Sequence, residues 1–190
     1  CSSDLIKRYQ NRKLYDTQQS CYVTLDDIAK MIRADEEVMV IDNKTKNDIK
    51  KGTREKVIAI LNQRLADAVD MKSQAKQAHW NVKGMNFIAL HELFDQVSTE
   101  METHIDDIAE RVTILGGTAL GTIRVAAANS TLAEYPLEIT DGADHVDALS
   151  TVLADFGKKV RADIDATDEL GDADTADLLT GVSRSVDKLL

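Results

Sequence analysis

Residues 79–95 read HWNVKGMNFIALHELFD, and this stretch joins two long segments whose apolar residues recur with the period of an α-helix. Before it, an apolar face predicts a helix from Thr53 to about Trp80. After it, a similar face predicts a helix from about Asn86 to Leu115, which ends at Gly116. Gly84 interrupts the pattern between them. The stretch therefore predicts a tight turn between two long helices.

Three further helices are predicted beyond Gly116. Residues 123–128 predict a short crossover helix, followed by a loop at Pro136. Residues 141–168 and 172–190 predict two more long helices, each opening beside Asp residues that favour a helix N-terminus. Four long helices with one crossover connection between the second and the third predict a mainly α fold, a ferritin-like four-helix bundle.

The first 49 residues contain short apolar segments instead of long helical periods, and they predict a small α+β domain. Strands are predicted near residues 5–9, 13–15 and 38–41, and residues 22–23 lead into a helix that begins at Thr24. Asp27 follows that Thr by three residues, which is typical of a capping box. Residues 50–52 predict a polar linker to the bundle, which we expect to span residues 53–190.

Composition restricts the class of protein. The 190 residues include a single Pro and 9 Gly, which favours uninterrupted helices. No apolar run approaches the roughly 20 residues of a membrane span, and the two cysteines, Cys1 and Cys21, are too few for a disulfide scaffold. These features predict a cytoplasmic protein with no membrane partner.

Charge is divided unevenly along the chain. Residues 1–50 carry 9 basic and 9 acidic side chains, whereas residues 51–190 carry 14 basic and 24 acidic ones, a net charge of −10. The larger part is expected to repel nucleic acid and attract cations. The alternative is that the acidic surface serves only solubility.

Five side chains on the first two long helices form a candidate ligand set for iron: His79, His91, Asp95, Asp106 and Glu110. His91 and Asp95, like Asp106 and Glu110, are four residues apart, so each pair lies on one helical face. Imidazole and carboxylate together suit Fe(II), and a sparse ligand set leaves positions open for an oxidant. The pattern predicts a ferroxidase site. The alternative is a set of solvated polar residues.

The five ligands cannot all bind one metal within one subunit. Asp95 and Asp106 lie about 16 Å apart along one helix at a rise of 1.5 Å per residue. If two such helices pack antiparallel about a two-fold axis, the histidine end of one subunit meets the Asp106 and Glu110 end of the other. The spacing therefore predicts two equivalent sites shared by a dimer.

These motifs resemble the Dps family of starvation-induced ferritin-like proteins over residues 53–190. The resemblance rests on His79-Trp80-Asn81-Val82-Lys83-Gly84-Met85-Asn86-Phe87, His91-Glu92-Leu93-Phe94-Asp95 and Asp106-Asp107-Ile108-Ala109-Glu110-Arg111. It implies a hollow dodecamer with ferroxidase centres at dimer interfaces, an iron oxide core, and hydrogen peroxide as preferred oxidant. It also implies that Trp80 takes up stray oxidising equivalents or packs at the interface. Compared with the family, the last helix is expected to be cut short at Leu190.

Residues 5–49 resemble a second family, the DNA-binding domain of polyhydroxyalkanoate accumulation regulators. The matching residues include Ile6-Lys7-Arg8-Tyr9-Gln10-Asn11-Arg12-Lys13-Leu14-Tyr15-Asp16-Thr17. Lys7, Arg8, Arg12 and Lys13 form a basic patch that we expect to contact DNA. DNA, and with it an association with the nucleoid, is therefore a second expected partner.

Three functions follow from these patterns. The first is peroxide-dependent iron oxidation and storage, which protects DNA from oxidative damage. The second is a DNA-binding regulator in which the bundle only multimerises the small domain, and the third is a structural cage with an idle site. His104 and His145 are expected at the surface or an interface. The acidic residues Asp163, Asp165, Asp168 and Glu169 are expected at a solvated helix end or lining a pore.

Overall fold

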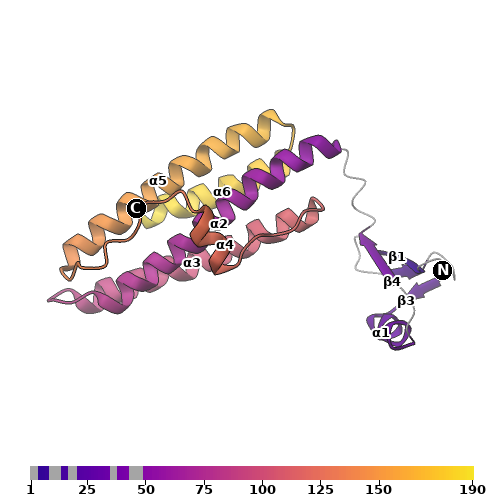
Figure 1. Ribbon diagram of the computed structural model, residues 1–190, viewed down its shortest axis with the longest axis horizontal. Helices are drawn as coiled ribbons and strands as arrows, with labels where there is room; N and C mark the ends of the chain where they lie inside the picture. Colours follow the sequence, from indigo (N-terminus) through magenta and orange to yellow (C-terminus); the bar gives the residue numbers. More distant parts are fainter. Residues whose placement is uncertain (1–3, 9–13, 17–20, 35–37, 43–48) are drawn as a thin grey trace. The chain divides into compact units, whose positions relative to one another are not determined.

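The computed structural model describes residues 4–8, 14–16, 21–34, 38–42 and 49–190. The chain divides into two compact units, Cys1–Asp48 and Ile49–Leu190. The mainly α class and the ferritin-like bundle predicted from the sequence are confirmed, with a small α+β unit before the bundle (Figure 1).

The small unit is a four-stranded sheet with one helix. Its elements are β1 (Asp4–Arg8), β2 (Leu14–Asp16), β3 (Cys21–Val23), α1 (Leu25–Arg33) and β4 (Val38–Asp42), and the strand order is β3-β2-β1-β4. β2 pairs antiparallel with both β1 and β3, whereas β4 pairs parallel with β1, which requires the crossover that α1 supplies. Leu14, Ile28 and Met31 form its core.

The capping box predicted at the start of α1 is present. The hydroxyl of Thr24 accepts a hydrogen bond from the backbone N–H of Asp27 at 3.2 Å, and the carboxylate of Asp27 accepts one from the backbone N–H of Thr24 at 2.8 Å. These bonds satisfy two donors that the first turn of a helix leaves free. The Thr24 hydroxyl also donates to the Asp27 carboxylate at 2.6 Å, and this bond, together with the one from the Thr24 backbone N–H, holds the pKa of the Asp27 carboxyl below its usual value.

The second unit contains α2 (Lys51–Asn81), α3 (Phe87–Ile114), α4 (Ile123–Asn129), α5 (Gly142–Glu169) and α6 (Ala173–Leu189). Helices α2, α3, α5 and α6 lie side by side, and α4 lies in the crossover between α3 and α5 (Figure 1). α2 begins within the expected linker, because the carbonyl of Lys50 already accepts hydrogen bonds from the N–H groups of Thr53 and Arg54. Lys51 and Gly52 are therefore helical.

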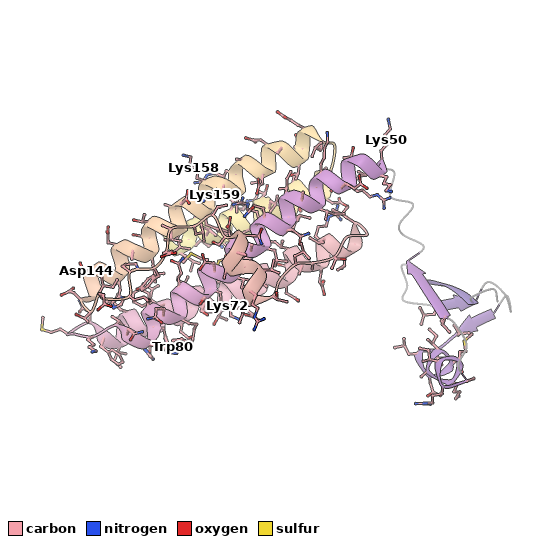
Figure 2. All side chains as sticks on the ribbon, in the orientation of Figure 1. Lys50, Lys72, Trp80, Asp144, Lys158 and Lys159 are labelled. Atoms are coloured by element: carbon pink, nitrogen blue, oxygen red, sulfur yellow. The ribbon has the colours of Figure 1, made fainter. Side chains whose placement is uncertain are left out.

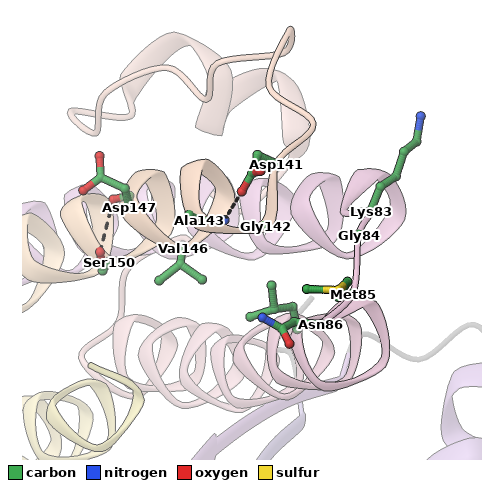
Figure 3. A pocket seen from close by; sticks show the side chains of 11 residues that line it. Lys83, Gly84, Met85, Asn86, Asp141, Gly142, Ala143, Val146, Asp147 and Ser150 are labelled. Carbon is green, nitrogen blue, oxygen red and sulfur yellow. Dashed lines mark hydrogen bonds between the residues drawn. The ribbon is translucent and has the colours of Figure 1, made fainter.

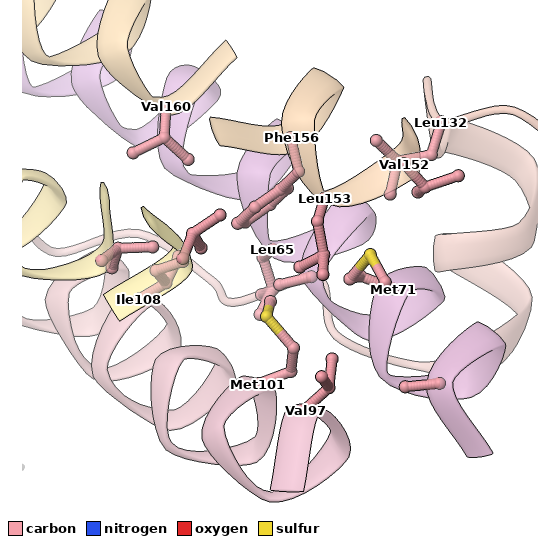
Figure 4. Packing of buried hydrophobic residues seen from close by; sticks show 14 of the residues in the cluster. Leu65, Met71, Val97, Met101, Ile108, Leu132, Val152, Leu153, Phe156 and Val160 are labelled. Atoms are coloured by element: carbon pink, nitrogen blue, oxygen red, sulfur yellow. The ribbon is translucent and has the colours of Figure 1, made fainter. Parts of the chain in front are cut away.

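One apolar core fills the bundle. Leu65 and Met71 of α2 pack with Met101 and Ile108 of α3 and with Phe156 of α5, and all five are fully buried (Figure 4). Burial of one such side chain contributes about 1.5–3 kcal/mol. The core extends along the whole length of α2 and α3, so it fixes the register of the two helices that carry the candidate ligands.

Buried charges tie the crossover segment to this core. Asp67 is fully buried, and its carboxylate accepts hydrogen bonds from Arg64 at 2.6 Å and from the backbone N–H of Thr131 at 2.7 Å. Arg64 also pairs with Asp163 of α5 at 2.7 Å. The expectation of a solvated or pore-lining Asp163 is therefore wrong, because its side chain is only 17% exposed, whereas Asp165, Asp168 and Glu169 are exposed.

Burial raises the pKa of Asp163 to about 6, with Asp67 acting in the same direction and Arg64 opposing it. A carboxyl with a raised folded-state pKa contributes stability that is present below pH 4 and lost as the pH rises through about 6. Asp163→Asn, which stays neutral, should therefore raise the free energy of unfolding by about 1–2 kcal/mol at pH 8 and change it little at pH 4.

Chemical denaturation at the two pH values measures this difference. Asp165→Asn, at an exposed position two residues further along α5, is the matched control and should show no such pH dependence. Equal destabilisation by Asp163→Asn at both pH values would contradict the account.

Candidate metal centre

His79 and His91 face each other across the turn between α2 and α3. The Nδ1 atom of His79 lies 2.8 Å from the backbone carbonyl oxygen of His91. The Nδ1 atom of His91 likewise lies 2.8 Å from the backbone carbonyl oxygen of His79. The two rings are stacked with centroids 3.6 Å apart. Because a carbonyl only accepts, each Nδ1 carries the proton, and in the neutral ring each Nε2 keeps a free lone pair. The fold therefore presents two imidazoles in the tautomer that binds a metal through Nε2.

The turn that brings the histidines together depends on Gly84. This residue has φ of 104°, in the region that favours glycine, and its carbonyl accepts a hydrogen bond from the N–H of Phe87, the first residue of α3. Val82 is buried before the turn, and the Phe87 ring lies 5.0 Å from the His91 ring. Local sequence thus explains how residues 12 positions apart become neighbours.

Asp95 lies one turn beyond His91 on α3, and its carboxylate is bound by Lys76 of α2. The distance from Nζ to Oδ1 is 2.6 Å. The hydrogen bond from Lys76 holds the pKa of Asp95 below its usual value, so the carboxylate is ionised at neutral pH. Sequence reasoning missed Lys76. The signal was its position three residues before His79, which places both side chains on the same side of α2.

Asp106 and Glu110 do not join this group. Both are exposed and lie further along α3, so that Asp106 is about 16 Å from Asp95 at 1.5 Å per residue. Among the residues that the structure describes, no three His, Cys, Asp or Glu side chains are close enough to hold one ion. The single chain thus contains two separated half-sets of donors, one with nitrogen and oxygen and one with oxygen alone.

Exposed apolar side chains lie next to the two histidines along α2 and α3, and on α4. Trp80 is 66% exposed, Ile88 62% and Ile123 of α4 80%. Lys72 and Trp80 lie on the same helix, α2 (Figure 2), and with Lys76 and Ile123 they line a groove of 280 Å³ between α2 and α4. Large apolar side chains gathered on a surface in this way are typical of protein interfaces.

A wider depression of 770 Å³ lies at the end of the bundle, between the α2–α3 turn and the start of α5 (Figure 3). Lys83, Met85 and Asn86 line one side of it, and Asp141 caps α5 on the other through the N–H of Ala143 at 2.8 Å. None of the five predicted ligands lines this depression. It is a separate feature of the surface.

His104 and His145 are not surface residues in this chain, which corrects the sequence-based expectation. They are 7% and 1% exposed, and burial lowers the pKa of each imidazole. Their sequence positions contained the signal: His104 falls in the helical period of Met101 and Ile108, and His145 falls in that of Leu149. A histidine at a position of the apolar helical period is therefore buried together with its apolar neighbours.

The predicted DNA-binding residues lie in the small unit. Lys7 and Arg8 are the last two residues of β1, whereas Arg12 and Lys13 fall outside the described residues. Assignment of these four residues to DNA therefore stays a prediction.

The fold defines a ferritin-like bundle protein. A ferritin-like domain model matches residues 58–189, and a model of the PHB/PHA accumulation regulator DNA-binding domain matches residues 5–64. The DNA protection during starvation protein of Agrobacterium fabrum is 46% identical over 148 residues, covering 78% of this chain and 91% of that protein. Its counterpart from Brevibacillus brevis is 32% identical, covering 74% and 93%.

Solved structures agree with these sequence matches. A Dps protein from Bacillus brevis superposes with a TM-score of 0.69 at 30% identity, covering 74% of this chain and 93% of that one. Mycobacterium smegmatis Dps gives 0.71 at 28% identity, covering 74% and 85%. The chain belongs to the Dps family of ferritin-like proteins. None of the helices in the described part is long and apolar enough to cross a membrane.

Lys76 should set the metal affinity of the histidine half-set. Lys76→Met keeps the aliphatic stem but frees the Asp95 carboxylate and removes a positive charge beside it, so Co(II), a redox-stable substitute for Fe(II), should bind roughly tenfold more tightly. Isothermal titration calorimetry measures the change.

Lys72→Met is the matched control, because Lys72 lies one turn earlier on α2 and pairs with Glu102 instead. Its affinity for Co(II) should stay close to that of the unmodified protein. Weaker binding by the Lys76 variant would show that the ammonium supports the site and does not compete for it.

Proposed function

We propose that this protein oxidises Fe(II) at sites shared between two subunits and stores the ferric product. The observation that supports this most strongly is the pair of imidazoles whose Nδ1 atoms are bound to carbonyls, which leaves a lone pair on each Nε2 of the neutral rings, next to an ionised carboxylate. Imidazole and carboxylate donors suit Fe(II), and a sparse set from each subunit leaves coordination positions for an oxidant. Fe(II) is the substrate in this scheme.

The second half of each site comes from a partner subunit. Asp106 and Glu110 are exposed and too far along α3 to reach the same ion as His91, yet an antiparallel partner would bring its own copies of them there. The exposed Trp80, Ile88 and Ile123 supply apolar area for such an interface. A two-fold axis then generates two equivalent sites, and a dodecameric cage built from these dimers would hold the mineral.

Hydrogen peroxide is the proposed oxidant. Two Fe(II) ions each give one electron, the O–O bond breaks, and with two protons the products are two Fe(III) ions and two waters. A bundle with 14 basic and 24 acidic side chains favours the arrival of Fe(II). This reaction removes iron and peroxide together, so it would protect DNA from the radicals that they form.

Removal of two ligands tests this activity. His91→Ala combined with Asp95→Ala should lower the rate of peroxide-dependent ferric formation on the order of 100-fold, because two of the donors are lost. Both side chains are partly exposed, so the helical circular dichroism should stay nearly unchanged. Stopped-flow absorbance of the ferric product measures the rate.

The matched control replaces the next residue after each ligand, Glu92→Ala with Gln96→Ala, both exposed on α3. This variant should oxidise iron at the normal rate. An unchanged rate of ferric formation in the variant that lacks His91 and Asp95 would contradict the site assignment. It would favour a structural cage without ferroxidase activity at this site.

DNA binding through the small unit is a second candidate function. It is favoured by the match of residues 5–64 to the DNA-binding domain of PHB/PHA accumulation regulators. Lys7, Arg8, Arg12 and Lys13 are the proposed contacts to phosphates. In this scheme the bundle presents several copies of the small unit to the duplex.

Truncation separates the two functions. Residues 51–190 carry a net charge of −10, so a chain without residues 1–50 should lose duplex binding at moderate salt and keep iron oxidation. Electrophoretic mobility shifts of the full and truncated chains measure this. Strong duplex binding by the truncated chain would assign DNA contact to the bundle instead.

A further inference from the structure

Tyr135 and His145 form a hydrogen-bonded pair between the crossover and α5. Tyr135 lies in the crossover after α4 and is partly buried, and His145, in the first turn of α5, is 1% exposed. The phenol oxygen is hydrogen-bonded to Nδ1 of His145, and the two rings stack with an interplanar angle of 18°. Nε2 of His145 is buried with no hydrogen-bond partner among the described residues.

In the Nε2–H tautomer of His145, the phenol donates this hydrogen bond to Nδ1. Burial raises the pKa of Tyr135 to about 12, so its hydroxyl proton is retained at neutral pH. In the described part of the chain, Nδ1 of His145 is the one acceptor within hydrogen-bond distance of that hydroxyl. The phenol proton can therefore pass along this hydrogen bond to Nδ1 of His145.

Phe94 connects this pair to the candidate metal centre. Its ring is 2% exposed and lies 6.3 Å from the His145 ring, which in turn lies 6.0 Å from the Tyr135 ring. Along α3, Phe94 follows His91 by three residues, about 5–6 Å between Cβ atoms, and immediately precedes Asp95. Each step from the metal ligands to the phenol is thus about the length of one side chain.

We propose that Tyr135 is a redox-active residue that supplies one electron to hydrogen peroxide when only one Fe(II) is present at a site, while His145 takes the phenol proton. This inference rests on the proposed iron oxidation. Fe(II) gives one electron and Tyr135 the other, the O–O bond breaks, and the proton moves to Nδ1. The products are Fe(III), two hydroxide ions, a neutral tyrosyl radical and the imidazolium of His145. No free hydroxyl radical leaves the site.

Trp80 is less suited to this role, although it is closer to the ligands along the sequence. Its indole is 66% exposed, and Nζ of Lys76 lies 5.8 Å from the ring centroid. An ammonium at that distance opposes the positive charge that an indole acquires when it loses an electron. Tyr135 loses its proton together with the electron, so it gains no charge.

Freeze-quench electron paramagnetic resonance tests the proposal on the full chain. Protein loaded with one Fe(II) per site is mixed with hydrogen peroxide, and ferric absorbance is recorded on the same sample. The unmodified protein should show a neutral tyrosyl radical with an exchangeable proton coupling, detected by comparing spectra in H₂O and D₂O. Tyr135→Phe should lose this signal, whereas Tyr22→Phe, in β3 of the small unit, should keep it.

The outcomes distinguish the role of Tyr135 from the proposed iron oxidation on which it rests. Ferric product at the normal rate without a tyrosyl radical, or a radical that survives Tyr135→Phe, overturns the role of Tyr135 and leaves iron oxidation standing. No ferric product overturns both. If Tyr135→Phe does not fold, mass spectrometry of the unmodified protein after repeated turnover decides: oxidised Tyr135 supports the proposal, and oxidation confined to other residues refutes it.

Discussion

The candidate site depends on two hydrogen bonds, which join Nδ1 of His79 and Nδ1 of His91 to each other's backbone carbonyl. These bonds fix both the orientation and the tautomer of the imidazoles before any metal arrives. They require the end of α2 and the start of α3 to lie at one separation, which the turn at Gly84 and the core below it maintain. The burial of Met71, Phe94 and Met101 therefore has a chemical consequence, because it keeps His79 and His91 oriented to bind a metal through Nε2.

Charge organises the surroundings of this pair at two levels. At the surface, Lys76 binds Asp95 and keeps it ionised, so the carboxylate is ordered yet available when a divalent cation displaces the ammonium. In the interior, Arg64 links Asp67 to Asp163 and Thr131 completes the network, which ties the crossover to α2 and α5. Buried ion pairs add little net stability, and Arg64 keeps Asp67 as its partner when Asp163 is neutral. The crossover that carries Tyr135 is thereby held against the bundle.

Much of this could be predicted from the sequence, because helical periods and glycine stops are local signals. The bundle helices end within two residues of their predicted positions, and the capping box of Thr24 and Asp27 is present. The separation of Asp106 and Glu110 from His91 followed from helix geometry alone. The pairing of Lys76 with Asp95, the burial of Asp163 and the pairing of His145 with Tyr135 could not be derived in this way, because each depends on which side chain of another helix or of the crossover lies opposite.

Subunit complementation tests the shared site most directly. The His91→Ala, Asp95→Ala subunit lacks one half-set of donors, and the Asp106→Ala, Glu110→Ala subunit lacks the other, so each alone should be inactive in peroxide-dependent iron oxidation. After equal amounts are unfolded together and refolded, half of the dimers are mixed, and each mixed dimer contains one intact site. The account predicts recovery of about a quarter of the unmodified rate. A mixture no more active than its two parents would contradict it.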